Sequence, residues 1–178
     1  ASVIASKASE DIEEVVDDLG EKHTQEETLP EECDLRGLEE AFLKQFSMVL
    51  SFERDGVEDF TQEGIREFLL EKARNGYSQK EEEWGPEIAR DMERLVTLQT
   101  VDLRWREHLL AMDHLKEGIG LRGYAQQNPL IEYKREGLDM FQEMVEQIKG
   151  EILQMLFRIQ VATQEETEQL EEAQQQPI

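Results

Sequence analysis

Two long runs of apolar residues at helical spacing, separated by a glycine-rich break, limit most strongly what this chain can fold into. The first run consists of Ile88, Met92, Leu95, Leu98, Trp105, Leu109 and Met112. The second consists of Leu138, Phe141, Val145, Ile148, Ile152, Met155 and Ile159. Steps of three and four residues place such side chains on one helix face. A helix of about 30 residues is roughly 45 Å long, so each needs support along its length, and we expect an antiparallel hairpin of two helices.

The break between the two runs reads GIGLRGYAQQNP and extends from Gly118 to Pro129. It contains three glycines, and each costs a helix about 1 kcal/mol relative to alanine. We therefore expect the tip of the hairpin not to be helical throughout. Asn128 and Pro129 suit the N-cap and the first turn of the second long helix.

The remainder of the chain also favours helices, because β-branched residues are scattered and no alternation is sustained. Shorter helices are predicted over residues 8–19, 35–50 and 61–74. Asp34 and Thr61 are expected to cap the second and third of these, while Gly20 and the Asn75–Gly76 pair are expected to end the first and third. The predicted fold class is all-α.

The segment between the third short helix and the first long one carries two conflicting signals. Ser78 to Glu81 matches a capping box, in which a hydroxyl and a carboxylate satisfy free backbone donors at a helix start. Gly85–Pro86 then interrupts the helix, because proline lacks an amide donor. Either a kink or a new helix with Pro86 in its first turn is expected there. With Trp84 closing its apolar cluster, a small helical subdomain over about residues 26–86 follows.

Composition argues against several classes of partner. The chain has 42 Asp and Glu against 19 Lys and Arg, so it repels phosphate backbones, and nucleic acid is not an expected partner. No apolar run reaches the roughly 20 residues that cross a bilayer, and no export signal precedes the first helix.

The single cysteine, Cys33, has no partner for an internal disulfide, which fits the cytoplasm. We expect a segment of a longer protein, with a linker over residues 21–33.

The sequence offers no pattern that predicts catalysis. Neither a phosphate-binding loop nor a dinucleotide fingerprint occurs. His108 and His114 are six residues apart and lie on different helix faces, while His23 and Cys33 are isolated in the linker, so no metal site is expected. Paired carboxylates follow from the acidic composition and indicate no acid–base chemistry.

The hairpin differs in charge from its surroundings. From Arg94 to Arg135 there are seven basic and five acidic residues, a charge of +2 that leaves −25 for the rest of the chain. This segment could approach acidic or neutral partners that the rest repels; ordinary helix-face charges are the alternative. Asp102 falls on the apolar stripe between Leu98 and Trp105, where an unpaired carboxylate is costly. We expect an arginine or a helix-terminus donor to pair with it.

One segment resembles a known family. Residues 98–141 contain VDLRWREHL, LRGYAQQNP and EYKREG, a combination similar to the C-terminal part of the SecA family, the ATP-driven motors of bacterial preprotein export. The similarity continues more loosely to about Val161. It implies four regions: the end of a long scaffold helix over 1–25, a helical wing domain over 26–90, a helical scaffold with a two-helix finger over 91–163 whose tip is 118–129, and a polar, disordered tail over 164–178.

The resemblance also implies roles for single residues. Tyr124 matches the aromatic residue of the finger tip that contacts the preprotein as it enters the SecY channel, and its loop neighbours match Leu121, Arg122, Gly123, Ala125 and Gln126. A flat amphipathic ring suits contact with many sequences; a tip residue that only packs on the hairpin is the alternative. Trp105 matches a scaffold tryptophan and is expected to pack in a core. Gly85–Pro86 departs from the family scheme, in which a helix runs from wing into scaffold.

The expected function follows from this resemblance. The family's nucleotide-binding folds, which use ATP and magnesium, have no counterpart in this sequence, so the chain is expected not to be an enzyme and to hold no cofactor. The family's cysteine-rich zinc tail has no counterpart either. The implied partners are the preprotein, the SecY channel complex and the remaining motor domains, at the cytoplasmic face of the plasma membrane. The alternative is a stand-alone acidic helical adaptor or chaperone-like protein. A phosphate loop upstream in the same reading frame would favour the motor.

Overall fold

The computed structural model describes residues 2–23, 34–53, 55, 57, 60–122 and 128–160, apart from the side chains of 2–9 and 120–122. These residues form five helices and no strand, which confirms the all-α prediction. The helices are α1 (Ser2–His23), α2 (Leu35–Phe46), α3 (Gln62–Trp84), α4 (Pro86–Arg122) and α5 (Pro129–Arg158). None of the helices in the described part of the chain is long and apolar enough to cross a bilayer.

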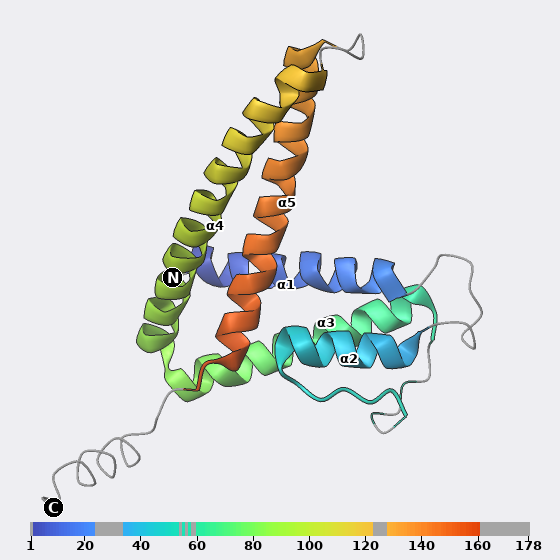
Figure 1. Ribbon diagram of the computed structural model, residues 1–178. Helices are drawn as coiled ribbons and strands as arrows, with labels where there is room; N and C mark the ends of the chain where they lie inside the picture. The colour runs from blue at the N-terminus through green and yellow to red at the C-terminus, as the bar shows by residue number, and fades with distance from the viewer. Residues whose placement is uncertain are drawn as a thin grey trace, which may run out of the picture.

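The predicted helical hairpin is present. In Figure 1, α4 and α5 lie side by side and antiparallel and project away from the other three helices, which gather at its foot. Helix α3 runs into α4 at the lower corner of that view, and α1 crosses the foot of the hairpin near α5. The hairpin thus has a supported foot and a far end that extends beyond the three shorter helices.

Local side-chain chemistry starts three of the helices as predicted. The side chain of Asp34 accepts a hydrogen bond of 2.9 Å from the amide of Gly37, and Thr61 accepts one of 3.1 Å from the amide of Gly64. Asn128 accepts a bond of 3.0 Å from the amide of Leu130, and Pro129 follows it in the first turn. Each cap satisfies an amide that has no partner inside its own helix.

The predicted helix ends are wrong in several places. Helix α1 continues through Gly20 to His23, and α2 stops at Phe46, where Ser47 takes a left-handed φ of 52°. Helix α3 passes through Gly76 without a break. A Cβ on Gly76 would overlap the sulfur of Met48, so this glycine allows close packing rather than ending the helix.

The predicted capping box is also wrong, because Ser78 and Glu81 lie inside α3. The Glu81 carboxylate accepts a hydrogen bond of 2.6 Å from Arg90 of α4 and does not turn back to a helix start. Helix α3 ends at Gly85, and Pro86 opens α4. Of the two outcomes expected at this pair, the new helix is the correct one.

One apolar core joins the three short helices to the foot of the hairpin. It includes Ile12 and Val16 of α1, Leu38, Phe42 and Phe46 of α2, Ile65, Leu69 and Tyr77 of α3, and Leu153, Leu156 and Phe157 of α5. Phe46 packs edge-on against Phe157, with 5.1 Å between the ring centroids. Full burial of each such side chain stabilises the fold by about 1.5–3 kcal/mol. The division into wing and scaffold stays a prediction.

An ion-pair network fixes α1 on α3. The Arg66 guanidinium donates to Asp17 at 2.6 Å and to Glu13 at 2.9 Å, and Arg74 reaches the other oxygen of Glu13 at 3.1 Å. The hydrogen bonds to Asp17 and Glu13 raise the pKa of Arg66 above its usual value. Helix α1 is therefore held by directional bonds as well as by the apolar core.

Candidate functional site: the helical hairpin

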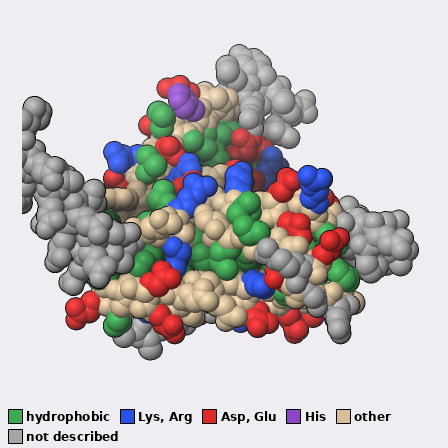
Figure 2. Space-filling model, turned by 90° about the horizontal axis from the view of Figure 1, so that it is seen from below, with side chains coloured by type: hydrophobic (Ala, Val, Ile, Leu, Met, Phe, Trp, Pro, Cys, Tyr) green, Lys and Arg blue, Asp and Glu red, His purple; other side chains and the backbone are tan. Residues whose placement is uncertain are grey.

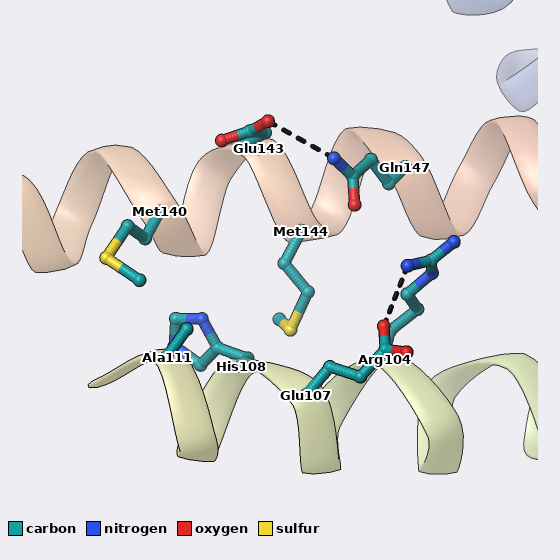
Figure 3. A pocket seen from close by; sticks show the side chains of 8 residues that line it. All are labelled: Arg104, Glu107, His108, Ala111, Met140, Glu143, Met144 and Gln147. Carbon is teal, nitrogen blue, oxygen red and sulfur yellow. Dashed lines mark hydrogen bonds and ion pairs between the residues drawn. The ribbon is translucent and has the colours of Figure 1, made fainter. Parts of the chain in front are cut away.

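The middle of the hairpin is packed by flexible side chains around one histidine. Figure 3 shows Met140 and Met144 of α5 pointing toward α4, with His108 of α4 pointing back between them. His108 and Met144 are both buried. The His108 ring lies 5.6 Å from that of Trp105 and 5.9 Å, edge-on, from that of Phe141. Methionines fill irregular gaps well, so the two helices stay in contact over this stretch.

Polar bonds fix the register of α4 against α5. The Arg104 guanidinium binds both carboxylate oxygens of Glu151, with Nε to Oε2 at 2.8 Å, and also donates to Glu107 at 2.7 Å. Such a two-pronged bond fixes direction as well as distance. Nearer the far end, a Cβ on Gly137 would lie 2.9 Å from the Met112 methyl group. The backbone of α5 therefore lies close to α4 there.

The packing continues to the last described turns before the tip. Ile119 of α4 is buried, and Glu132 of α5 is also buried and pairs with Arg135 at 2.5 Å. At the foot, α5 is also bound to α2, where the side-chain amide of Gln45 donates to the carbonyl of Gly150 at 2.8 Å. The hairpin is thus held together from its foot almost to its tip, and such a packed pair moves as a unit.

The predicted tip residues can be placed only in part. Gly123, Tyr124, Ala125 and Gln126 lie outside the described residues, and Leu121 and Arg122 are described only as backbone in the last turn of α4. Helix α4 extends four residues beyond the predicted end at Gly118. The preprotein contact of these six residues stays a prediction from the resemblance.

The two predicted scaffold residues are both exposed. Asp102 pairs with Arg106 at 2.5 Å, which confirms the expected arginine partner, but both side chains are 68% exposed, so this pair contributes little stability. Trp105 is 45% exposed. The expectation that it packs in a core is therefore wrong for this chain, and its structural role in the scaffold stays a prediction.

The small pocket of Figure 3, about 170 Å³ in volume, lies between the two helices. Its polar groups bind one another: Glu107 pairs with Arg104, and the Gln147 amide donates to Glu143 at 3.2 Å. In the described ranges, no group of three His, Cys, Asp or Glu could hold a metal ion. Nothing in this pocket assigns a substrate to it.

An apolar surface along one side of the hairpin is left uncovered by the described residues. Many members of the two apolar runs are exposed, among them Leu98, Trp105, Leu109, Leu138 and Phe141. A groove of about 600 Å³ continues this surface at the foot, lined in part by Leu98, Val101, Val145, Ile148 and Ile152. One partner helix covers only part of a wide apolar stripe. The sequence indicates this surface through the width of the apolar stripe, which is greater than the area that one neighbouring helix covers.

Charged side chains are unevenly distributed over the described surface. In the view from below in Figure 2, acidic side chains are frequent along the lower edge of the molecule, whereas above it Lys and Arg alternate with acidic and hydrophobic side chains. At the foot, Lys149 of α5 pairs with Glu14 of α1. Basic residues of the hairpin therefore serve in part to bind the acidic helices of the same chain.

Comparison with known proteins gives the family. The model of the SecA Wing and Scaffold domain matches residues 2–160. The protein translocase subunit SecA of Syntrophus aciditrophicus is 41% identical over 93% of this chain, and that of Syntrophobacter fumaroxidans is 40% identical over 94%. The subunit of Desulforapulum autotrophicum is 47% identical over 84% of the chain. The chain spans 20%, 20% and 18% of these relatives, respectively. The chain therefore belongs to the SecA wing and scaffold family.

Proposed function

We propose that this chain is the wing and finger part of a protein-translocating motor. In this proposal the tip of the hairpin contacts the preprotein at the mouth of the SecY channel, and the scaffold helices transmit ATP-driven movement to it. The observation that carries the proposal is the 40–47% identity, over 84–94% of the chain, to proteins named protein translocase subunit SecA. The continuous packing of α4 on α5 supports a part that moves as a body.

The exposed apolar surface of the hairpin supports a partner inside the same motor. Exposed apolar patches of this kind mark contact sites, and the relatives are about five times as long as this chain. We assign the remaining motor domains to this surface, and ATP and magnesium to those domains. The motor would work at the cytoplasmic face of the plasma membrane as a peripheral protein. The size of the relatives favours this proposal over a stand-alone adaptor.

Replacing Tyr124 by Asp in a complete SecA motor tests the proposed contact. We expect preprotein transport into inverted membrane vesicles to fall about tenfold, which corresponds to a loss of about 1.4 kcal/mol of contact with the moving chain. Basal ATP hydrolysis should remain close to that of the parent, because this proposal assigns the nucleotide site to the remaining motor domains and not to this chain.

The matched control is Tyr124→Phe, which keeps the flat ring and loses only the hydroxyl, and which should retain most of the transport. Transport at the parent rate in the Tyr124→Asp motor would remove this residue from the proposed contact. A parallel loss of ATP hydrolysis would instead indicate damage to the motor and would also count against the assignment.

A further inference from the structure

The connection between α3 and α4 consists of a single residue. Helix α3 ends at Trp84, α4 begins at Pro86, and Gly85 between them has φ 76° and ψ 159°. The amide of Gly85 donates to the carbonyl of Glu81 at 2.9 Å, and its carbonyl accepts from the amide of Ala89 at 3.0 Å. With no loop between them, the angle between the two helices depends on Gly85, on the side chains that cross the joint and on the packing of α4 against α5, whose foot lies in the core.

Two side chains of α3 bind two side chains of α4 across this joint. The Tyr77 hydroxyl donates to Oε1 of Glu93, and the Arg90 guanidinium donates to that same oxygen. The other arm of Arg90 donates to Oε1 of Glu81 at 2.6 Å. Tyr77 is 6% exposed and Glu93 is 5% exposed. Arg90 therefore connects carboxylates from both helices, and its planar fork fixes their relative position.

A third contact ties the end of α5 to the same part of α3. The Lys80 ammonium donates to the carbonyl of Ile159, just beyond α5, at 2.8 Å. It also lies 5.3 Å from the centroid of the Trp84 ring. Burial lowers the pKa of Lys80, an effect that nearby Glu83 opposes. A cation at a helix C-terminus is stabilised by the free carbonyls, so both helices of the hairpin are anchored on the last turns of α3.

The polar groups of the joint carry a cost in stability. Oε2 of Glu93 is buried and has no hydrogen-bond donor among the described residues, and a buried polar atom without a partner costs about 1–3 kcal/mol. Apolar side chains of similar volume would avoid this cost. What the polar groups add is direction, because their bonds form only at one relative placement of the two helices.

We propose that Tyr77, Arg90 and Glu93 are positioning residues that set the angle between α3 and α4, and with it the direction in which the hairpin leaves the wing helices. The assignment of the angle rests on geometry alone, whereas its consequence for transport rests on the proposed function. A merely stabilising role would change the free energy of unfolding and leave the angle as it is.

A change in this angle can be detected in the 178-residue chain as a change in the distance between two spin labels. With Cys33→Ser as background, labels at Glu67→Cys on α3 and Asp113→Cys on α4 occupy two exposed positions on either side of the joint. In Tyr77→Phe and in Arg90→Lys we expect the distance distribution to become about twice as broad, because one of the directional contacts is lost while helicity is retained. The control Tyr133→Phe removes a hydroxyl from α5, away from the joint, and should leave the width unchanged.

Parent-like distributions in both variants would overturn the proposal. If Tyr77→Phe loses the helical circular dichroism signal, the proposal is judged from Arg90→Lys alone. That variant keeps the positive charge and loses only the two-armed guanidinium group. In the complete motor, the same two substitutions should lower transport more than ATP hydrolysis; equal losses would refute the link to transport. Failure of the proposed function would appear separately, as normal transport in Tyr124→Asp, with the distance measurement unaffected.

Discussion

Burial of the Tyr77 phenol makes the stability of the fold depend on pH. Burial, together with its hydrogen bond to Glu93, raises the pKa of Tyr77 well above the usual value, which is about 10 for tyrosine. The ionised form would place a second negative charge beside the Glu93 carboxylate, in an interior that solvates charge poorly. The hydroxyl therefore stays protonated, and remains a donor, throughout the neutral range.

This shift predicts a loss of stability at alkaline pH. In the unfolded chain Tyr77 ionises near pH 10, while in the folded chain it keeps its proton. Its contribution to the free energy of unfolding is thus complete below about pH 10 and falls above it, by up to about 1.4 kcal/mol per pH unit. Urea unfolding between pH 8 and 11, about two units below and one above the ordinary tyrosine pKa, measures this slope.

One variant makes the alkaline measurement specific. Tyr77→Phe has no group to ionise at this position, so its stability should fall less steeply above pH 10 than that of the parent. Identical slopes in the parent and in Tyr77→Phe would show that the shift is absent.

At the scale of the helices and their connections, the joint at Gly85 depends on an unusual backbone conformation. Its φ of 76° and ψ of 159° fall in a region that essentially only glycine adopts. No atom lies within 4 Å of the position that a Cβ would take, so the constraint comes from the backbone and not from crowding. An alanine there would be strained in spite of the open space around it.

Gly85→Ala is therefore expected to lower the free energy of unfolding by about 1–3 kcal/mol. Gly150→Ala is the matched control, because Gly150 lies inside α5 and a Cβ there also meets nothing within 4 Å. That substitution should raise stability by about 0.5–1 kcal/mol, as usual for alanine in a helix. Urea denaturation of both variants checks the opposite signs; equal effects would argue against the strained backbone.

The helix starts were predictable from the sequence because they depend on neighbours. Asp34, Thr61 and Asn128 bond amides two or three residues further on, so their capping role is visible in a short window. The end of α3 was missed because the fate of Gly76 is decided by Met48, which lies far away in the sequence. Local reasoning cannot distinguish a glycine that ends a helix from one that admits another side chain.

In the candidate site, too, local features were predictable and long-range contacts were not. The hairpin followed from periodicity, and its tip residues were assigned through a resemblance to a family. The polar groups of the joint gave no signal in the sequence, because Tyr77 and Glu93 are 16 residues apart on different helices. The exposure of Trp105 was missed because an apolar stripe does not reveal how much of it one neighbouring helix covers.

At the scale of the whole molecule, the apolar side of the hairpin is balanced against a large net charge. Exposed Leu98, Leu109, Leu138 and Phe141 lie along α4 and α5, whereas the chain carries a net charge of −23. Like charge keeps copies apart at low ionic strength, and salt screens this repulsion beyond about 10 Å at 0.1 M. The balance between attraction and repulsion therefore depends on salt.

We expect the isolated chain to self-associate as salt is raised. Replacing Leu98 and Leu109 together by Lys should weaken association at least tenfold, since each buried leucine contributes about 1.5–3 kcal/mol. Sedimentation velocity at low and high salt measures this. The control pair, Leu43→Lys with Val49→Lys, adds the same charge at exposed positions outside the hairpin and should change association far less. Equal effects of the two pairs would mean that charge alone controls association.

The single-residue joint between α3 and α4 has a mechanical consequence. Helix α4 has 37 residues, which at 1.5 Å per residue makes a lever arm of roughly 55 Å. A turn of about 10° at Gly85 would then move the far end of α4 by roughly 10 Å, because the displacement grows in proportion to the length of the helix. Small rearrangements of a few side chains at the pivot are thereby magnified into a stroke comparable to several residues of extended polypeptide.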